Sequence, residues 1–239
     1  MLSIKGLSKT FGRQKALDEI SLDFSAGEGL ALIGPNGSGK TTLIKSILGL
    51  NTISQNKIFF KGQDIYKQSD YRKYIGYMPQ ISRFPEQMKV RELFALMKNI
   101  RPDVKEYDHT LYKAFDIDKL ARKKMGILSG GMRQKVSAAL AFLFCPEVMV
   151  LDEPTAGLDP VSNELLKEKL KRVIKEENRL VIITSHILND LDDIASRLVY
   201  MMEGKVLFDK QLADLKAETS ENRLNKMIAT VLQKQKINV

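Results

Sequence analysis

Residues 34–41 read Gly-Pro-Asn-Gly-Ser-Gly-Lys-Thr, which matches the phosphate-binding pattern G-x-x-x-x-G-K-[ST]. The glycines let the backbone curl tightly, so that its N–H groups turn toward phosphate oxygens. Lys40 supplies a compact positive charge for the outer phosphates, and the Thr41 hydroxyl suits Mg²⁺. We therefore expect a nucleotide to be bound by Gly34, Pro35, Asn36, Gly37, Ser38, Gly39, Lys40, Thr41 and Thr42.

The flanking sequence has the setting that this loop requires. The apolar run Leu30–Ile33 precedes the loop and predicts a buried strand. Residues 42–48 follow with helical spacing, and Gly49 stands where a glycine commonly ends a helix. Strand, glycine loop and helix together favour a nucleotide site over a chance match.

A second motif supplies carboxylates. The apolar run Val148–Leu151 is followed directly by Asp152 and Glu153. An enzyme with such a loop needs an acid at the end of a neighbouring strand to hold Mg²⁺, and a base to activate water. Asp152 suits the metal, and Glu153 points elsewhere and is placed to accept a proton from water.

The rest of the pattern predicts an α/β fold in one domain. Leu180–Ile183 is a further apolar strand, and a Lys- and Glu-rich helix over 162–177 would join it in parallel to 148–151. Residues 198–201 and 206–208 predict a hairpin around Glu203-Gly204. The expected plan is a parallel core over 1–80 and 145–210, a helical insert over 81–144, a tail over 211–239, and an antiparallel flank from segments 2–5, 20–24, 57–60 and 64–66.

Composition narrows the class of protein. The 239 residues carry a net charge of +9, but the basic residues are dispersed, so we favour a solvated surface over binding to nucleic acid or to an anionic membrane surface. Cys145 is the only cysteine, which excludes an internal disulfide, and we expect it to be buried. The chain shows neither a leader nor an apolar run long enough for a membrane span, so we expect a cytoplasmic protein.

Further segments resemble those of ABC-type ATPases, in the same order along about residues 1–210. The signature segment of that family is similar to Leu128-Ser129-Gly130-Gly131-Met132-Arg133-Gln134. The glutamine loop resembles 77–80, the D-loop resembles 156–160, and the switch histidine resembles His186. Phe11 takes the place of the aromatic residue on which adenine stacks. The resemblance implies a P-loop NTPase fold and the ATP-binding subunit of an ABC transporter.

The resemblance also implies roles for single residues. Catalysis would use Glu153 as the general base, with His186 at the γ-phosphate and Gln80 sensing Mg²⁺ and water. Thr41, Gln80 and Asp152 would hold the metal. Phe11 would stack on adenine, and the ATP held by a second copy of the chain would meet Ser129, Gly130, Gly131 and, across the interface, Asp159. The implied partners are that second copy and membrane-spanning subunits, with the chain peripheral on the inner face of the membrane.

Two residues depart from the common family pattern. Met132 replaces a glutamine, and Phe11 replaces a tyrosine, but both changes leave the groups nearest ATP in place. Residues 131–135 resemble the ATPases of exporter-like transporters, and also the ATPase that serves copper-site maturation of nitrous oxide reductase.

One alternative stays open from the sequence: an ABC-type ATPase without transport, such as a soluble iron–sulfur assembly subunit. A membrane partner would dock on the surface of 81–110 beside Gln80, where Arg83, Phe84 and Met88 would either line a groove or be buried. The C-terminal stripe of Leu224, Met227, Ile228, Val231 and Leu232 predicts a helix that caps the core, with a docking helix for a partner as the alternative.

Overall fold

The computed structural model describes residues 1–237, with side chains up to Gln233. Within that range a central sheet has the strand order β10-β9-β3-β8-β7-β6. All neighbouring pairs in it are parallel except β9 with β10, which form the expected hairpin. The strands are β3 (Gly29–Ile33), β6 (Ile75–Met78), β7 (Val148–Asp152), β8 (Leu180–Thr184), β9 (Arg197–Met202) and β10 (Lys205–Gln211). The parallel pairing predicted for 148–151 and 180–183 is confirmed.

An antiparallel sheet lies beside this core, in the order β2-β1-β4-β5. Its strands are β1 (Leu2–Phe11), β2 (Gln14–Phe24), β4 (Ile58–Phe60) and β5 (Gln63–Asp64). Strands β1 and β2 are longer than predicted. The tight turn between them at Gly12, with φ 57°, lets both strands continue up to the turn. Buried side chains of this sheet pack with α1 (Lys40–Ile47) and the near face of the central sheet.

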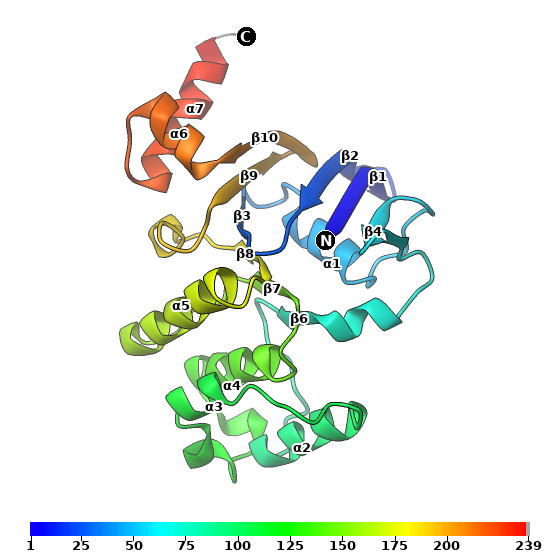
Figure 1. Cartoon of the computed structure of the whole chain (residues 1–239), viewed down its shortest axis with the longest axis vertical. Helices are drawn as coiled ribbons and strands as arrows, with labels where there is room; N and C mark the ends of the chain where they lie inside the picture. The colour runs from blue at the N-terminus through cyan, green and yellow to red at the C-terminus, as the bar shows by residue number, and fades with distance from the viewer. Residues whose placement is uncertain (238–239) are drawn as a thin grey trace.

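Helices α2 (Val90–Ile100), α3 (Thr110–Ala114) and α4 (Gly130–Phe142) gather at one end of the molecule, drawn in green at the bottom of Figure 1. They form the predicted helical insert. Helix α4 begins at Gly130, because the Ser129 hydroxyl accepts a hydrogen bond from the Met132 N–H and caps it. Short 3₁₀ turns, η2 (Ile117–Leu120) and η3 (Met125–Ile127), connect α3 to α4.

The turn after α4 corrects one expectation: Cys145 is exposed, not buried. The helix has ended and the chain must reverse to enter β7. Cys145 therefore adopts φ 50°, and its N–H donates to the Phe142 carbonyl at 3.0 Å. Its side chain is left outside the packed core.

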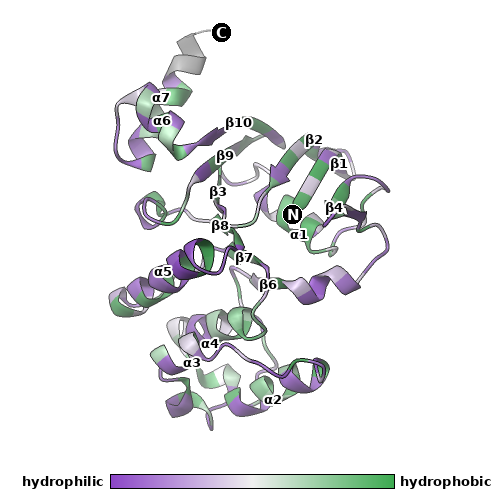
Figure 2. Ribbon diagram, viewed as in Figure 1, coloured by the Kyte–Doolittle hydropathy of each residue, from purple (hydrophilic) through white to green (hydrophobic). Residues whose placement is uncertain are grey.

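Helix α5 (Pro160–Lys175) connects β7 to β8 and begins two residues earlier than predicted. Asp159 caps it through the Ser162 N–H, and Pro160 suits the first helical position because it has no N–H to leave unpaired. Figure 2 shows hydrophilic and hydrophobic residues alternating along α5. Leu166, Leu170, Val173 and Ile174 are buried, whereas Val161 near the start of the helix is exposed.

The C-terminal part folds back on the core. Helices α6 (Leu212–Thr219) and α7 (Leu224–Ile237) follow β10, and α7 contacts η4 (Leu188–Asp190). The predicted stripe is buried from Leu224 to Val231, with Leu232 packed beside it, which confirms the capping helix. Residues 238–239 of the expected tail lie outside the described residues. No helix within 1–237 has the length and apolar character needed to cross a membrane.

The loop, the carboxylates and the signature segment

The glycine loop connects the end of β3 to the start of α1, as the sequence predicts. Gly34 has φ 152° and Gly39 has φ 103°, values that other residues rarely adopt. A Cβ on Gly34 would collide with the Met201 carbonyl, and one on Gly39 would lie 2.6 Å from the Ala16 carbonyl oxygen. Both glycines are therefore required by close packing as well as by the turn.

A cavity of about 290 Å³ opens above this loop. It brings together most of the predicted site from five segments of the chain: β1, the loop with α1, the segment after β6, the end of β7 and the segment after β8. The lining residues are Phe11, Gln14, Ala16, Asn36, Gly37, Ser38, Gly39, Lys40, Thr41, Thr42, Gln80, Asp152, Glu153 and His186. Gly34 and Pro35 form the base of the loop and do not line the cavity.

Lys40 is held inside the loop by the loop's own backbone. Its Nζ donates to the Gly34 carbonyl at 2.7 Å and to the Pro35 carbonyl at 3.0 Å. Burial lowers the pKa of the Lys40 ammonium, while the charges of Asp152 and Glu153 act in the opposite direction. The ammonium therefore lies preorganised beside the carboxylates at the end of β7.

The two carboxylates differ in their surroundings. Asp152 is buried at the end of β7, and its Oδ1 accepts a hydrogen bond from the Thr184 hydroxyl at 2.5 Å. Glu153 adopts φ 52°, and its Oε1 lies 2.8 Å from Nε2 of His186. Asp152 is thus fixed to the neighbouring strand, whereas Glu153 lines the cavity together with His186.

Three residues of this region were not predicted. Thr184 ends a buried strand next to β7, and a polar residue in that position is a signal that would have identified it. Gln14 and Ala16 line the cavity from β2. Nothing in the local sequence marks them, because only the packing of the antiparallel sheet beside the loop brings them there.

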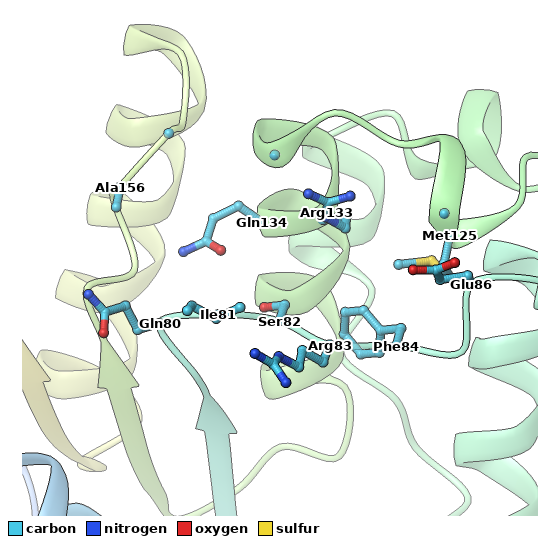
Figure 3. A pocket seen from close by; sticks show the side chains of 13 residues that line it. Gln80, Ile81, Ser82, Arg83, Phe84, Glu86, Met125, Arg133, Gln134 and Ala156 are labelled. Atoms are coloured by element: carbon cyan, nitrogen blue, oxygen red, sulfur yellow. The ribbon is translucent and has the colours of Figure 1, made fainter.

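The signature segment lies elsewhere. Among the described residues that line the 290 Å³ cavity, none comes from Ser129, Gly130 or Gly131. Gly130 lines a second cavity of about 640 Å³, shown in Figure 3, together with Gln80 and Gln134. Gln80 borders both cavities and is the residue they share.

The Asp159 carboxylate is bound by two residues of its own chain. Its carboxylate accepts from the N–H of Ser162 at 2.9 Å and lies 2.6 Å from Nζ of Lys135 in α4. The Lys135 ammonium, helped by Ser162, holds the pKa of this carboxyl well below its usual range. Asp159 does not line the loop cavity.

A groove of about 280 Å³ lies beside the segment after β6, between the sheet and the helical insert. Arg83 and Phe84 line it with Tyr77 and Phe144, as expected for the surface beside Gln80. Met88, the other expected residue, packs against the core and does not line the groove.

Phe11 stands at the rim of the loop cavity with half of its side chain exposed. We expect Phe11→Ala to weaken ATP binding roughly 5- to 150-fold, because stacking of a base on an aromatic ring contributes about 1–3 kcal/mol. Hydrolysis at saturating ATP should be unchanged. Titration with a fluorescent ATP analogue measures the affinity, and Phe11→Trp should retain it.

Phe59 offers a matched control for this measurement. It is a half-buried phenylalanine on the same antiparallel sheet, with Lys5 over its ring at 4.9 Å, as Lys9 lies over Phe11 at 5.2 Å. Phe59 does not line the cavity. An equal loss of affinity in Phe59→Ala and Phe11→Ala would show that the sheet, and not stacking, was disturbed.

Comparison with known proteins identifies the family. The model of the family described as "ABC transporter" matches residues 17–156. The uncharacterized ABC transporter ATP-binding protein YhaQ of Bacillus subtilis is 34% identical over 90% of this chain and 73% of its own length. The sulfate/thiosulfate import ATP-binding protein CysA of Pseudomonas aeruginosa is 32% identical over 86% of this chain and 65% of its own length.

Among solved structures, an ATP-binding subunit of an ABC transporter superposes with a TM-score of 0.87 at 26% identity, covering 97% of this chain and 99% of that one. The match in sequence includes the glycine loop and both carboxylates, and the match in fold extends over the helical insert and the C-terminal helices. The chain therefore belongs to the ABC transporter family, as an ATP-binding cassette that hydrolyses ATP.

Proposed function

We propose that this chain is the ATP-hydrolysing subunit of an ABC transporter, which dimerises around two ATP molecules and powers transport through separate membrane-spanning subunits. In this reading residues 1–239 are a single ATP-binding domain with the core, helical insert and tail expected above. The observation that carries the proposal is the separation of the glycine loop from the signature segment, which line different cavities.

A signature that lines a different cavity from the loop of its own chain needs a second chain to meet a loop-bound ATP. Helix α4 opens at Gly130 with unpaired N–H groups, and such a helix start attracts phosphate. A second copy would bring its loop-bound ATP to Ser129, Gly130 and Gly131, and each site would combine the loop of one chain with the signature of the other. Asp159, bound to Lys135, would then support the interface from within its own chain.

The residues of the loop cavity have separate roles in binding and hydrolysing ATP. Phe11 stacks on adenine, and the loop N–H groups and Lys40 bind the phosphates. Glu153 takes the proton from the attacking water, and His186, which already contacts Glu153, orients that carboxylate and lies near the γ-phosphate. Holding Glu153 in one geometry matters because a base acts only when water lies within hydrogen-bond reach.

The oxygen donors in the cavity fit Mg²⁺. Thr41 offers a hydroxyl, Gln80 an amide oxygen and Asp152 a carboxylate, and hard oxygen ligands are those that Mg²⁺ prefers. The Asp152 carboxylate is fixed by Thr184 and keeps lone pairs free for the metal or its water ligands. When bound, Mg²⁺ neutralises phosphate charge and orients the outer phosphates.

Partners follow from the surface beside Gln80. The groove lined by Arg83 and Phe84 connects directly to the segment that carries Gln80, so a cytoplasmic segment of a membrane-spanning subunit seated there would sense ATP at the site. The chain would then be peripheral on the inner face of the cell membrane. Residues 131–135 favour the exporter-like subgroup, and the likeness to nitrous oxide reductase maturation ATPases rests on the same residues.

The composite site gives a direct test. Lys40→Ala and Ser129→Arg should each inactivate the homodimer, because each spoils both of its sites. Mixed dimers contain one site with both lesions and one site with none. Mixing the two proteins should therefore restore up to about half of the ATPase activity of the same fraction of wild-type dimer, as measured by phosphate release at increasing ratios.

Two controls make the result decisive. Lys40→Ala mixed with itself should stay inactive, and mixing should leave the melting temperature of each protein unchanged. A negative result is followed by sedimentation of Glu153→Gln with ATP in the absence of Mg²⁺. If that protein stays monomeric at high concentration, the sandwich dimer is wrong; if it dimerises, the two sites turn over only together.

A further inference from the structure

The backbone of Glu153 is held in an unfavourable conformation. Its φ of 52° places a residue with a side chain in the left-handed region, which costs about 1 kcal/mol or more and persists only where neighbours fix it. On the N-terminal side Thr184 does this, because its carbonyl and hydroxyl oxygens both accept from the Glu153 N–H at 3.1 Å.

On the C-terminal side the restraint comes from the signature helix. Nε2 of Gln134 lies 3.3 Å from the carbonyl oxygen of Glu153 and 3.3 Å from that of Pro154. Gln134 is 6% exposed, and Figure 3 shows it reaching from α4 toward the segment that carries Ala156. One amide with two hydrogens thus binds both carbonyls next to the proposed base.

The rest of that segment is fixed to the same helix. A Cβ on Gly131 would lie 2.6 Å from the Gly157 carbonyl oxygen, so helix and loop pack at the distance that glycine permits. One turn further on, Lys135 binds the carboxylate of Asp159. Residues 153–159 therefore contact α4 along its first two turns, immediately after the signature serine.

We propose that Gln134 is a positioning residue that transmits the placement of the signature helix to Glu153 of the same chain. The inference rests on the proposed function, in which the signature contacts the ATP of the partner chain. Gln134 ties the Glu153 carbonyl to α4 whether or not the signature is engaged, so the position of that helix sets the carboxylate at the other site. The two sites of the dimer are thereby linked through one side chain.

The first test removes the amide. Gln134→Met keeps the length of the side chain and loses its donors, and we expect kcat to fall about tenfold while the Kd for ATP changes less than twofold. Gln134→Asn, which retracts the amide by one methylene, should give the same split if Gln134→Met folds poorly. Gln87→Met, an exposed glutamine on the helical insert, is the matched control and should match wild type. Unchanged kcat in both Gln134 variants would overturn the proposal.

The second test asks which site is affected. In mixed dimers of Lys40→Ala with Ser129→Arg, the intact site uses the loop and Glu153 of the Ser129→Arg chain and the signature of the Lys40→Ala chain. Gln134→Met should lower activity about tenfold when it is added to the Ser129→Arg chain, and much less when added to the other. Equal losses, or the reverse order, would show a structural role or an action on the signature and would overturn the proposal.

The two hypotheses fail separately. Wild-type turnover in Glu153→Gln would defeat the proposed function. Loss of turnover in Glu153→Gln together with wild-type kcat in Gln134→Met would defeat only the positioning role. If the mixed dimers are inactive because the two sites turn over only together, the contrast between kcat and Kd in the homodimer decides.

Discussion

Replacing Glu153 by glutamine should reduce ATP turnover by about 10²- to 10⁴-fold, which is the usual contribution of a general base. The exchange keeps the size of the side chain and its contact with His186, but it removes the group that takes the proton from water. ATP binding should be close to wild type, because the loop and Phe11 are unchanged. The protein should then accumulate as an ATP-bound dimer.

Single-turnover hydrolysis and size-exclusion chromatography with ATP measure the two effects. Glu164→Gln is a suitable control, since that carboxylate is exposed on α5 and pairs with Lys167. Turnover within threefold of wild type would remove Glu153 from the role of base. Loss of ATP affinity in place of turnover would instead make it a binding residue.

The elements that carry the chemistry could be predicted because their signals are local. A few neighbouring residues are enough to identify three of these elements. Glycine spacing marks the loop, and an apolar run ended by a polar group marks the strand that ends at Asp152 and the strand before His186. The family resemblance added Phe11, Gln80 and His186, which no local signal marks by itself. Local signals therefore account for the loop residues and the two carboxylates of the cavity.

What the sequence could not show depends on contacts between distant segments. Strand β6 was not predicted, because Ile75–Met78 is short and has no alternation; it forms by pairing with β7, and Gly76 lets α4 pack closely on it. Helix α6 lies within the tail expected to be helical over 211–239, but its own bounds were not predicted, since its hydrophobic spacing is weak. In the sequence, nothing distinguishes Gln134 from other polar residues of its helix. Its role becomes visible only in the fold, where its amide donates to the Glu153 carbonyl.

Lys40→Ala should lower ATP affinity by about 10²- to 10³-fold, the largest effect on binding in the chain. The ammonium is already partly buried near Asp152 and Glu153, and it is the cation that the loop offers to the outer phosphates. Without it, a triphosphate would be brought next to two carboxylates with only backbone N–H groups to oppose their charge. Removing one partner of a fully buried ion pair costs about 3–5 kcal/mol, and the partly buried Lys40 should fall at the lower end of that range.

Lys45→Ala is the matched control, because Lys45 lies on the same helix, is exposed, and does not line the cavity. It removes the same charge from the protein but should bind ATP as wild type does. Titration with a fluorescent ATP analogue at two salt concentrations separates the cases. A similar loss in both variants would mean that net charge attracts ATP, and it would contradict a specific contact. A loss confined to Lys40→Ala and insensitive to salt would identify a buried ion pair with phosphate, because such pairs are little screened.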